Sequence, residues 1–159
     1  MSELKELIER VAQPGSVAWI GVRAARLEAV QVVTEASVTD AGLQGDRAKA
    51  GKRAVTLFQM EHLTPIASYL GRSAPVDPAL LRRNIGVVGI NLVSLRGRVV
   101  ALGANARLRI TGPCALCSRM GEAFGHGGYA AVRGHGGMTA EVVRPGTIAL
   151  GDTITALPE

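Results

Sequence analysis

The sequence predicts a mostly β protein, a closed or nearly closed β-barrel with a few short helices. Eight or more short segments alternate apolar and polar residues, which is the pattern of half-buried strands. Twenty glycines and seven prolines supply turns between these segments. Helical spacing is brief and rare, so the strand–helix alternation of a parallel α/β sheet is not indicated.

The chain has 159 residues, which is long enough for one domain with a real core. We expect residues 1–16 to form a helix and a linker, and residues 17–159 to form a single barrel domain. The helix is predicted over 2–11, because Ser2 can cap it and the apolar residues that follow have helical spacing. We expect this helix to lie over the barrel.

The remaining elements are predicted from the same patterns. Strands are predicted over 17–23, 28–39, 54–58, 87–88, 98–102, 105–110, 139–143, 146–149 and 151–155. Short helices are predicted over 59–70 and 119–124, and a single helical turn from Asp77 to Leu81. Two similar glycine-rich segments, 125–128 and 134–137, are interpreted as hairpin corners.

The formal net charge is +5, and its distribution is uneven. Between Asp77 and Glu122 there is no acidic residue but there are seven arginines: Arg82, Arg83, Arg96, Arg98, Arg107, Arg109 and Arg119. Either a solvated surface or a site for an anionic ligand explains this window, and the planar fork of arginine suits phosphate. The five aromatic residues are scattered, which argues against binding of single-stranded nucleic acid.

The sequence has no charged-then-apolar leader and no apolar run of about 18 residues, so neither a signal peptide nor a membrane span is expected. Two cysteines do not make a secreted disulfide framework. We therefore expect a cytoplasmic protein without nucleic-acid or membrane partners.

Both cysteines lie in one C-x-x-C motif, Cys114 to Cys117, where a strand pattern breaks at Gly112-Pro113. Structural zinc needs four ligands, there is no second pair, and the spacing to His126 and His135 is unusual. A redox pair of the thioredoxin type needs a βαβ setting. Two interpretations remain, buried structural cysteines or one reactive thiolate favoured by Arg119 and a nearby helix start. Such a thiolate can attack, carry sulfur or bind a metal.

Four further stretches of the chain are residues 42–47, 56–61, 81–85 with 89–92, and 112–117. In this order they resemble the MOSC domain, the family related to the C-terminal domain of molybdenum cofactor sulfurase. The ending, residues 134–141 followed by 146–152, also looks like the closing strands of the family. The ordered set covers about residues 17–156 and is fairly specific.

The resemblance implies a MOSC-type barrel that binds the molybdenum cofactor, an anionic pterin that carries phosphate. It implies that Cys117 coordinates molybdenum or carries sulfur, with Cys114 as the second choice. It further implies that Asp46 is catalytic, because it positions Arg47 or shuttles protons. The cofactor-binding residues would be Arg47, Arg83, Asn84, Arg119 and Cys114.

Some standalone relatives reduce N-hydroxylated bases, so the implied activity is reduction of N–O bonds, with an electron-donor protein as partner. Two alternatives stay open. The chain is a sulfur carrier or cofactor-delivery protein that holds a persulfide on Cys117 and has a sulfur-donor partner, or it is an inert barrel with buried cysteines.

The sequence departs from the family pattern at two positions. Ala48 stands where histidine is common, and Arg83 stands where glutamate is common, which concerns substrate or partner specificity. Pyridoxal phosphate is not expected, because Lys5 belongs to the terminal helix and Lys49 and Lys52 to a glycine-flanked loop.

Overall fold

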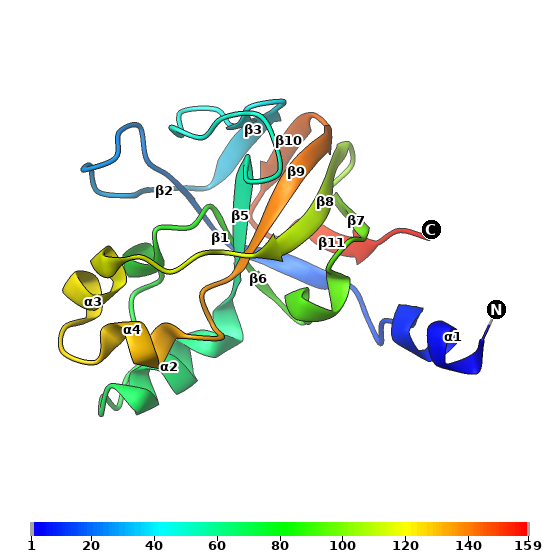
Figure 1. Ribbon diagram of the computed structural model, residues 1–159. Helices are drawn as coiled ribbons and strands as arrows, with labels where there is room; N and C mark the ends of the chain where they lie inside the picture. The colour runs from blue at the N-terminus through cyan, green and yellow to red at the C-terminus, as the bar shows by residue number, and fades with distance from the viewer. Residues whose placement is uncertain (1, 159) are drawn as a thin grey trace.

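The computed structural model describes residues 2–158, and its strands close into a barrel (Figure 1). The strands are β1 (Gly15–Val22), β2 (Gln31–Val33), β3 (Glu35–Thr39), β4 (Gly42–Leu43), β5 (Val55–Gln59), β6 (Ile85–Val88), β7 (Val99–Leu102), β8 (Ala106–Pro113), β9 (Met138–Arg144), β10 (Gly146–Ala149) and β11 (Thr153–Ala156). The α-helices are α1 (Glu3–Glu9), α2 (Leu63–Tyr69), α3 (Ser118–Phe124) and α4 (Gly128–Val132). Three 3₁₀ turns are η1 (Met60–His62), η2 (Pro78–Leu81) and η3 (Leu92–Leu95).

Seven strands form the ring of the barrel. Their order is β1-β6-β5-β9-β8-β7-β11, and the pairing of β11 with β1 closes the ring. Strands β5 and β6 run parallel, and the other neighbours in the ring are antiparallel. Strand β2 extends this sheet beyond β1, and β3, β4 and β10 form a separate three-stranded sheet. The prediction of a closed, mostly β-barrel is confirmed.

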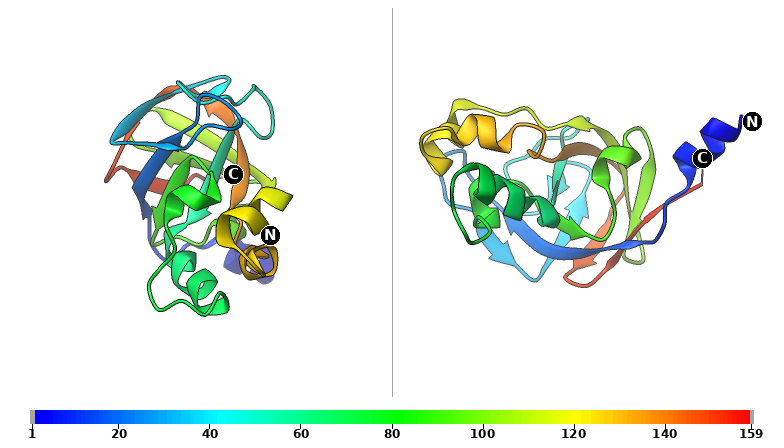
Figure 2. Two further views of the ribbon diagram at one scale, coloured as in Figure 1. Left: turned by 90° about the vertical axis from the view of Figure 1, so that its left-hand side faces the viewer. Right: turned by 90° about the horizontal axis from the view of Figure 1, so that it is seen from below.

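Aliphatic side chains fill the barrel, because inward and outward positions alternate along each strand. Ile20, Leu57 and Leu108 are fully buried in this core. A second apolar cluster joins the helices to one end of the barrel, where the rings of Trp19 and Phe58 meet edge to face at 5.5 Å. Figure 2 shows α2, α3 and α4 gathered at that end, with α1 at the other.

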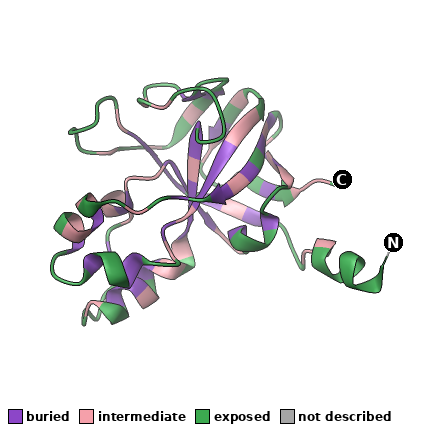
Figure 3. Cartoon of the chain, viewed as in Figure 1, coloured by how far each residue is buried: buried purple, intermediate pink, exposed green. Residues whose placement is uncertain are grey.

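The N-terminal helix forms as predicted but does not pack as expected. The Ser2 hydroxyl accepts a hydrogen bond from the backbone N–H of Lys5 at 3.2 Å. Helix α1 buries no residue: Leu4, Leu7 and Ile8 are 66%, 57% and 64% exposed, and the helix projects from the barrel (Figure 3). The expectation that it lies over the barrel is wrong, because periodicity defines a helix face without defining what covers that face.

Three other departures come from pairing between distant segments. The strand predicted over 28–39 is divided at Thr34 into β2 and β3, which belong to different sheets. Strand β8 continues through Gly112-Pro113 to pair with β9, with a register shift after Ile110. The two glycine-rich segments are not hairpin corners, because α4 lies between them. Within residues 2–158, no helix has the length and apolar character needed to span a bilayer.

Candidate functional site

Two adjoining hollows form a basic cleft beside the end of β1. The larger, about 390 Å³, is bounded by Arg23, by the loop after β4 and by the segment before β6. The smaller, about 190 Å³, contains Cys117, and we call it the Cys117 pocket. The two share four arginines, and together we call them the arginine cleft. Its basic residues are Arg23, Arg26, Arg47, Lys49, Arg53, Arg82, Arg83 and Arg119.

A reciprocal pair of hydrogen bonds holds the loop after β4 against the end of β1. The backbone N–H of Arg23 donates to Oδ1 of Asp46 at 2.8 Å, and the backbone N–H of Arg47 donates to the carbonyl of Arg23 at 2.9 Å. The loop can turn sharply because Gly45 has a φ of +89°. Asp46 thus fixes the backbone that presents Arg47.

Asn84 is buried and ties three barrel strands together. Its Oδ1 accepts hydrogen bonds from the backbone N–H and the hydroxyl of Thr56, at 3.0 and 3.2 Å. Its Nδ2 donates to the carbonyl of Gly21 at 3.2 Å. These bonds join the ends of β1, β5 and β6. Asn84 therefore forms part of the wall of the cleft, and its side-chain amide is already bonded to the protein.

Arg82 is held in a strained position where the two hollows meet. Among residues 2–158 it is the one non-glycine residue with positive φ, at +58°, which costs an L-residue free energy. Its Nη2 donates to the carbonyls of Arg26 and Glu28 at 2.8 and 3.1 Å. Its Nε is buried and has no hydrogen-bond partner in the described part of the chain. The Nε of Arg98, outside the cleft, is in the same state, so this feature by itself does not mark a ligand site.

Arg83 bonds to the cysteine segment, residues 114–117. Its Nε donates to the carbonyl of Gly136 at 2.8 Å, and its Nη2 donates to the carbonyl of Ala115 at 3.2 Å. Gly136 packs closely here, since a Cβ at that position would lie 2.6 Å from the Leu116 side chain. Arg83 therefore fastens the cysteine segment to the loop before β9, and its guanidinium is largely committed to the protein.

The cleft concentrates positive charge without matching carboxylates. Asp46 is the one acidic residue among those described that line it. Across residues 2–158, the ion pairs join Lys5 to Glu9, Arg10 to Glu6 and Arg109 to Glu141, and all lie outside the cleft. Burial lowers the pKa of Arg23, and repulsion from Arg82 and Arg47 lowers it further. A bound anion would relieve this repulsion.

The two cysteines open onto different cavities. Cys117 is exposed, precedes α3 and lines the Cys117 pocket with Arg119. Cys114 is 8% exposed and lines a third hollow of about 190 Å³, the Cys114 pocket, whose walls are largely apolar. Burial raises the pKa of the Cys114 thiol, although Arg83 opposes the shift, so this thiol is favoured in its neutral form.

The Cys114 pocket also contains a histidine pair that the sequence did not predict. Nδ1 of His62 and Nδ1 of His135 lie 3.1 Å apart, and their rings meet edge to face. Burial lowers the pKa of His62, and the neighbouring His135 lowers it further. These residues are 73 positions apart in the sequence, so no local motif indicates their contact.

The sequence-predicted residues are thus partly brought together. Asp46, Arg47, Arg83 and Asn84 line the larger hollow, while Cys117 and Arg119 meet Arg47 and Arg83 in the Cys117 pocket. Cys114 lies apart. Five basic residues of the cleft are not among the site residues predicted from the sequence: Arg23, Arg26, Lys49, Arg53 and Arg82. Two features of the sequence point to Arg82. It lies between Asp77 and Glu122, where there is no acidic residue, and it follows a capped helical turn.

Comparisons with known proteins agree with this architecture. No curated protein matches the sequence. The YUAD protein from Bacillus subtilis has a similar structure, with a TM-score of 0.78 and 20% identity over 89% of this chain and 94% of that chain. YiiM from Geobacillus stearothermophilus gives a TM-score of 0.74 and 18% identity over 91% of this chain and 76% of that chain. YiiM from Escherichia coli gives 0.71 and 19%, covering 91% and 70%.

At these identities the structural likeness concerns the fold. The family itself is established by sequence, because the MOSC domain matches residues 28–155, well over half of the chain. The resemblance noted in the sequence is therefore confirmed, and the chain belongs to the MOSC domain family.

Proposed function

We propose that the protein binds a molybdenum cofactor in the arginine cleft, with Cys117 as the metal ligand, and reduces N-hydroxylated substrates. One observation supports this most directly: an exposed thiol lies in the arginine cleft, whose described lining has eight basic residues and one carboxylate. Arginine forks bind phosphate, and a thiolate is a soft metal ligand.

The residues present fit such a cofactor. Within residues 2–158, no three His, Cys, Asp or Glu side chains group as ligands for a bare metal ion. A metal that a pterin dithiolene already holds needs only one further protein ligand, which Cys117 can provide. Arg82 lines both hollows of the cleft, and its guanidinium is of the type that binds phosphate.

The protein's own residues would bind and orient the cofactor and would supply protons to the substrate. Arg47 and Arg82 would hold the phosphate, and Arg119 would keep the Cys117 pocket positive. Asp46 would hold Arg47 in place through the backbone of Arg23, and it is the carboxylate of the cleft that could carry a proton. Arg83 and Asn84 would act through the wall that they fix, because their polar atoms already bond to the protein.

The proposed reaction breaks the N–O bond of a hydroxylamine-type group. When bound, the cofactor would supply the electron pair for this cleavage. Of the supplied pair and the pair of the N–O bond, one stays on nitrogen, which gains a proton. The other leaves with the oxygen, which gains a second proton and departs as water. The electrons come in turn from a reduced redox protein, the donor class that this proposal requires.

Metal and pterin analysis of purified protein from a cofactor-producing host tests the proposal. We expect about one molybdenum and one pterin per chain in the wild type, as a single thiolate ligand requires. Cys117→Ala should lose both, whereas the matched variant Cys114→Ala should keep both. Activity is then measured on an N-hydroxylated base with a chemically reduced donor. Loss of molybdenum in Cys114→Ala but not in Cys117→Ala would refute the ligand assignment.

A sulfur-carrier function is the second candidate, because the exposed Cys117 thiol is accessible to a donor protein. In that case the purified protein would lack molybdenum and carry sulfur that cyanide releases. This sulfur should disappear in Cys117→Ala and persist in Cys114→Ala. Absence of molybdenum, pterin and labile sulfur together would contradict both candidates.

A further inference from the structure

The basic residues at the two ends of the arginine cleft are different. Arg26 and Arg119 line the Cys117 pocket but not the larger hollow. Lys49 and Arg53 line the larger hollow but not the Cys117 pocket. The arginines between them line both. The cleft is therefore an extended basic channel with a distinct pair of cations at each end.

One phosphate group does not balance this charge. A phosphate monoester carries about two negative charges, and a few well-placed donors saturate its oxygens. Eight basic residues face the cleft, with Asp46 as the carboxylate that opposes them among the residues described. Burial lowers the pKa of Arg23, and repulsion from Arg82 and Arg47 lowers it further.

The middle of the channel already offers a place for the first anion. Arg82 lines both hollows, and its guanidinium is fixed by the carbonyls of Arg26 and Glu28. Its Nε remains without an acceptor, and its backbone is strained. An anion held by Arg82 together with Arg26 and Arg119 would lie in the Cys117 pocket, because all three line it. Lys49 and Arg53 then remain for another anion.

We propose that the arginine cleft binds two phosphate groups at once, one beside Cys117 and one at the Lys49–Arg53 end. The inference rests on the proposed function only in taking the cofactor's phosphate as the first of the two. A phosphorylated substrate or a nucleotide attached to the cofactor carries the second. Both sources present the same phosphate chemistry to the same cations.

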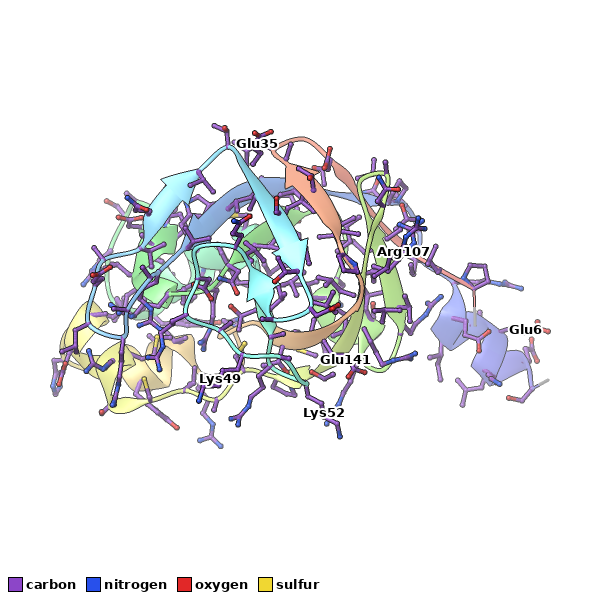
Figure 4. All side chains as sticks on the ribbon, turned by 90° about the horizontal axis from the view of Figure 1, so that it is seen from above. Glu6, Glu35, Lys49, Lys52, Arg107 and Glu141 are labelled. Carbon is purple, nitrogen blue, oxygen red and sulfur yellow. The ribbon has the colours of Figure 1, made fainter. Side chains whose placement is uncertain are left out.

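Isothermal titration calorimetry of the cofactor-free protein with inorganic phosphate, at low ionic strength, tests this inference. We expect two phosphates per chain. Lys49→Gln with Arg53→Gln should weaken one site by roughly tenfold or more, since each charge-assisted contact contributes substantially. Arg26→Gln with Arg119→Gln should weaken the other. Lys52→Gln is the matched control, because Lys52 lies on the same loop as Lys49 (Figure 4) but does not line the cleft.

Alkylation of Cys117 identifies which site is which. Phosphate should slow alkylation in the wild type and in the Lys49/Arg53 variant, and this protection should vanish in the Arg26/Arg119 variant. One phosphate per chain, weakened equally by both pairs of substitutions, would overturn the inference and leave the proposed function standing. Absence of molybdenum and pterin in the loaded preparation would instead remove the proposed function, whatever the phosphate count.

Analysis of the loaded protein separates the two sources. A nucleotide released with the cofactor on denaturation assigns the second phosphate to the cofactor. If no nucleotide is released, an N-hydroxylated nucleotide should have a KM roughly tenfold below that of the matching nucleoside. Lys49→Gln with Arg53→Gln should then remove this difference by raising the KM of the nucleotide toward that of the nucleoside. If denaturation releases no nucleotide and the two KM values are equal, the inference is contradicted.

Discussion

Cys114 and Cys117 lie three positions apart but face different cavities. Cys117 is exposed in the arginine cleft, and Cys114 is buried in the Cys114 pocket beside the histidine pair. Arg83 fastens the segment between them to the loop before β9. Side chains that face separate cavities do not present a common ligand position, so the C-x-x-C motif provides one accessible thiol rather than a chelating pair.

The two thiols should therefore differ in reactivity. Cys114→Ala and Cys117→Ala each leave a single cysteine. The remaining Cys117 should react with iodoacetamide about tenfold or more faster than the remaining Cys114, because burial shields Cys114 and raises its pKa. Intact-mass spectrometry at neutral pH gives the rates. Equal rates in the two variants would contradict the separation of the cavities.

Asp46 should stabilise the fold through its acceptor oxygen. Asp46→Ala leaves the backbone N–H of Arg23 without this partner and should lower the free energy of unfolding by about 1–2 kcal/mol. Asp46→Asn keeps an acceptor oxygen and should lose clearly less. Urea unfolding in high salt, which screens the change in charge, measures both. An equal loss in the two variants would show that the charge, which both remove, matters rather than the hydrogen bond.

Asn84 should prove to be a structural residue. Asn84→Ala removes the bonds to Thr56 and Gly21 inside the wall of the cleft, so we expect a loss of about 2–3 kcal/mol in the free energy of unfolding. Asn84→Asp should also destabilise, because it cannot donate to the Gly21 carbonyl. Urea unfolding at neutral pH is again the measurement. An unchanged midpoint for Asn84→Ala would reveal that the wall does not depend on this side chain.

The histidine pair should make stability depend on pH. The pKa of His62 lies below its usual 6.5, mainly because of burial, so the unfolded chain takes up a proton at His62 before the folded chain does. The free energy of unfolding should therefore fall as pH is lowered below 6.5. His62→Gln should reduce this slope, whereas His126→Gln, at an exposed position, should not. Identical slopes in both variants would argue against the pair.

Two glycines of the loop before β9 should respond differently to alanine. Gly134 and Gly137 have φ of +86° and +94°, so alanine costs about 1 kcal/mol at either position from backbone strain alone. Gly134 has open space around it, but a Cβ on Gly137 would collide with the carbonyl oxygen of Leu57. Gly137→Ala should therefore lower the thermal midpoint clearly more than Gly134→Ala. Similar thermal midpoints in the two variants would mean that β5 moves away from the added Cβ without a loss of stability.

The sequence by itself determined the local structure and the class of fold. Alternating residues gave the barrel strands, and side-chain caps gave the starts of α1 and η2, where Asp77 accepts from the backbone N–H of Ala79. These features depend on residues within a few positions of each other, so they can be recognised without knowing what packs where. The family resemblance predicted roles for Asp46 and Cys117, and both residues line the arginine cleft.

Only the tertiary structure decided which arginines form that cleft. Of the acid-free window, Arg82, Arg83 and Arg119 line it, whereas Arg98 bonds to the carbonyls of Glu9 and Leu157 and Arg109 pairs with Glu141. Arg23, Arg26, Arg47 and Arg53 come from earlier in the chain. Barrel closure and strand register bring these segments together, and neither can be read from the density of charge along the sequence.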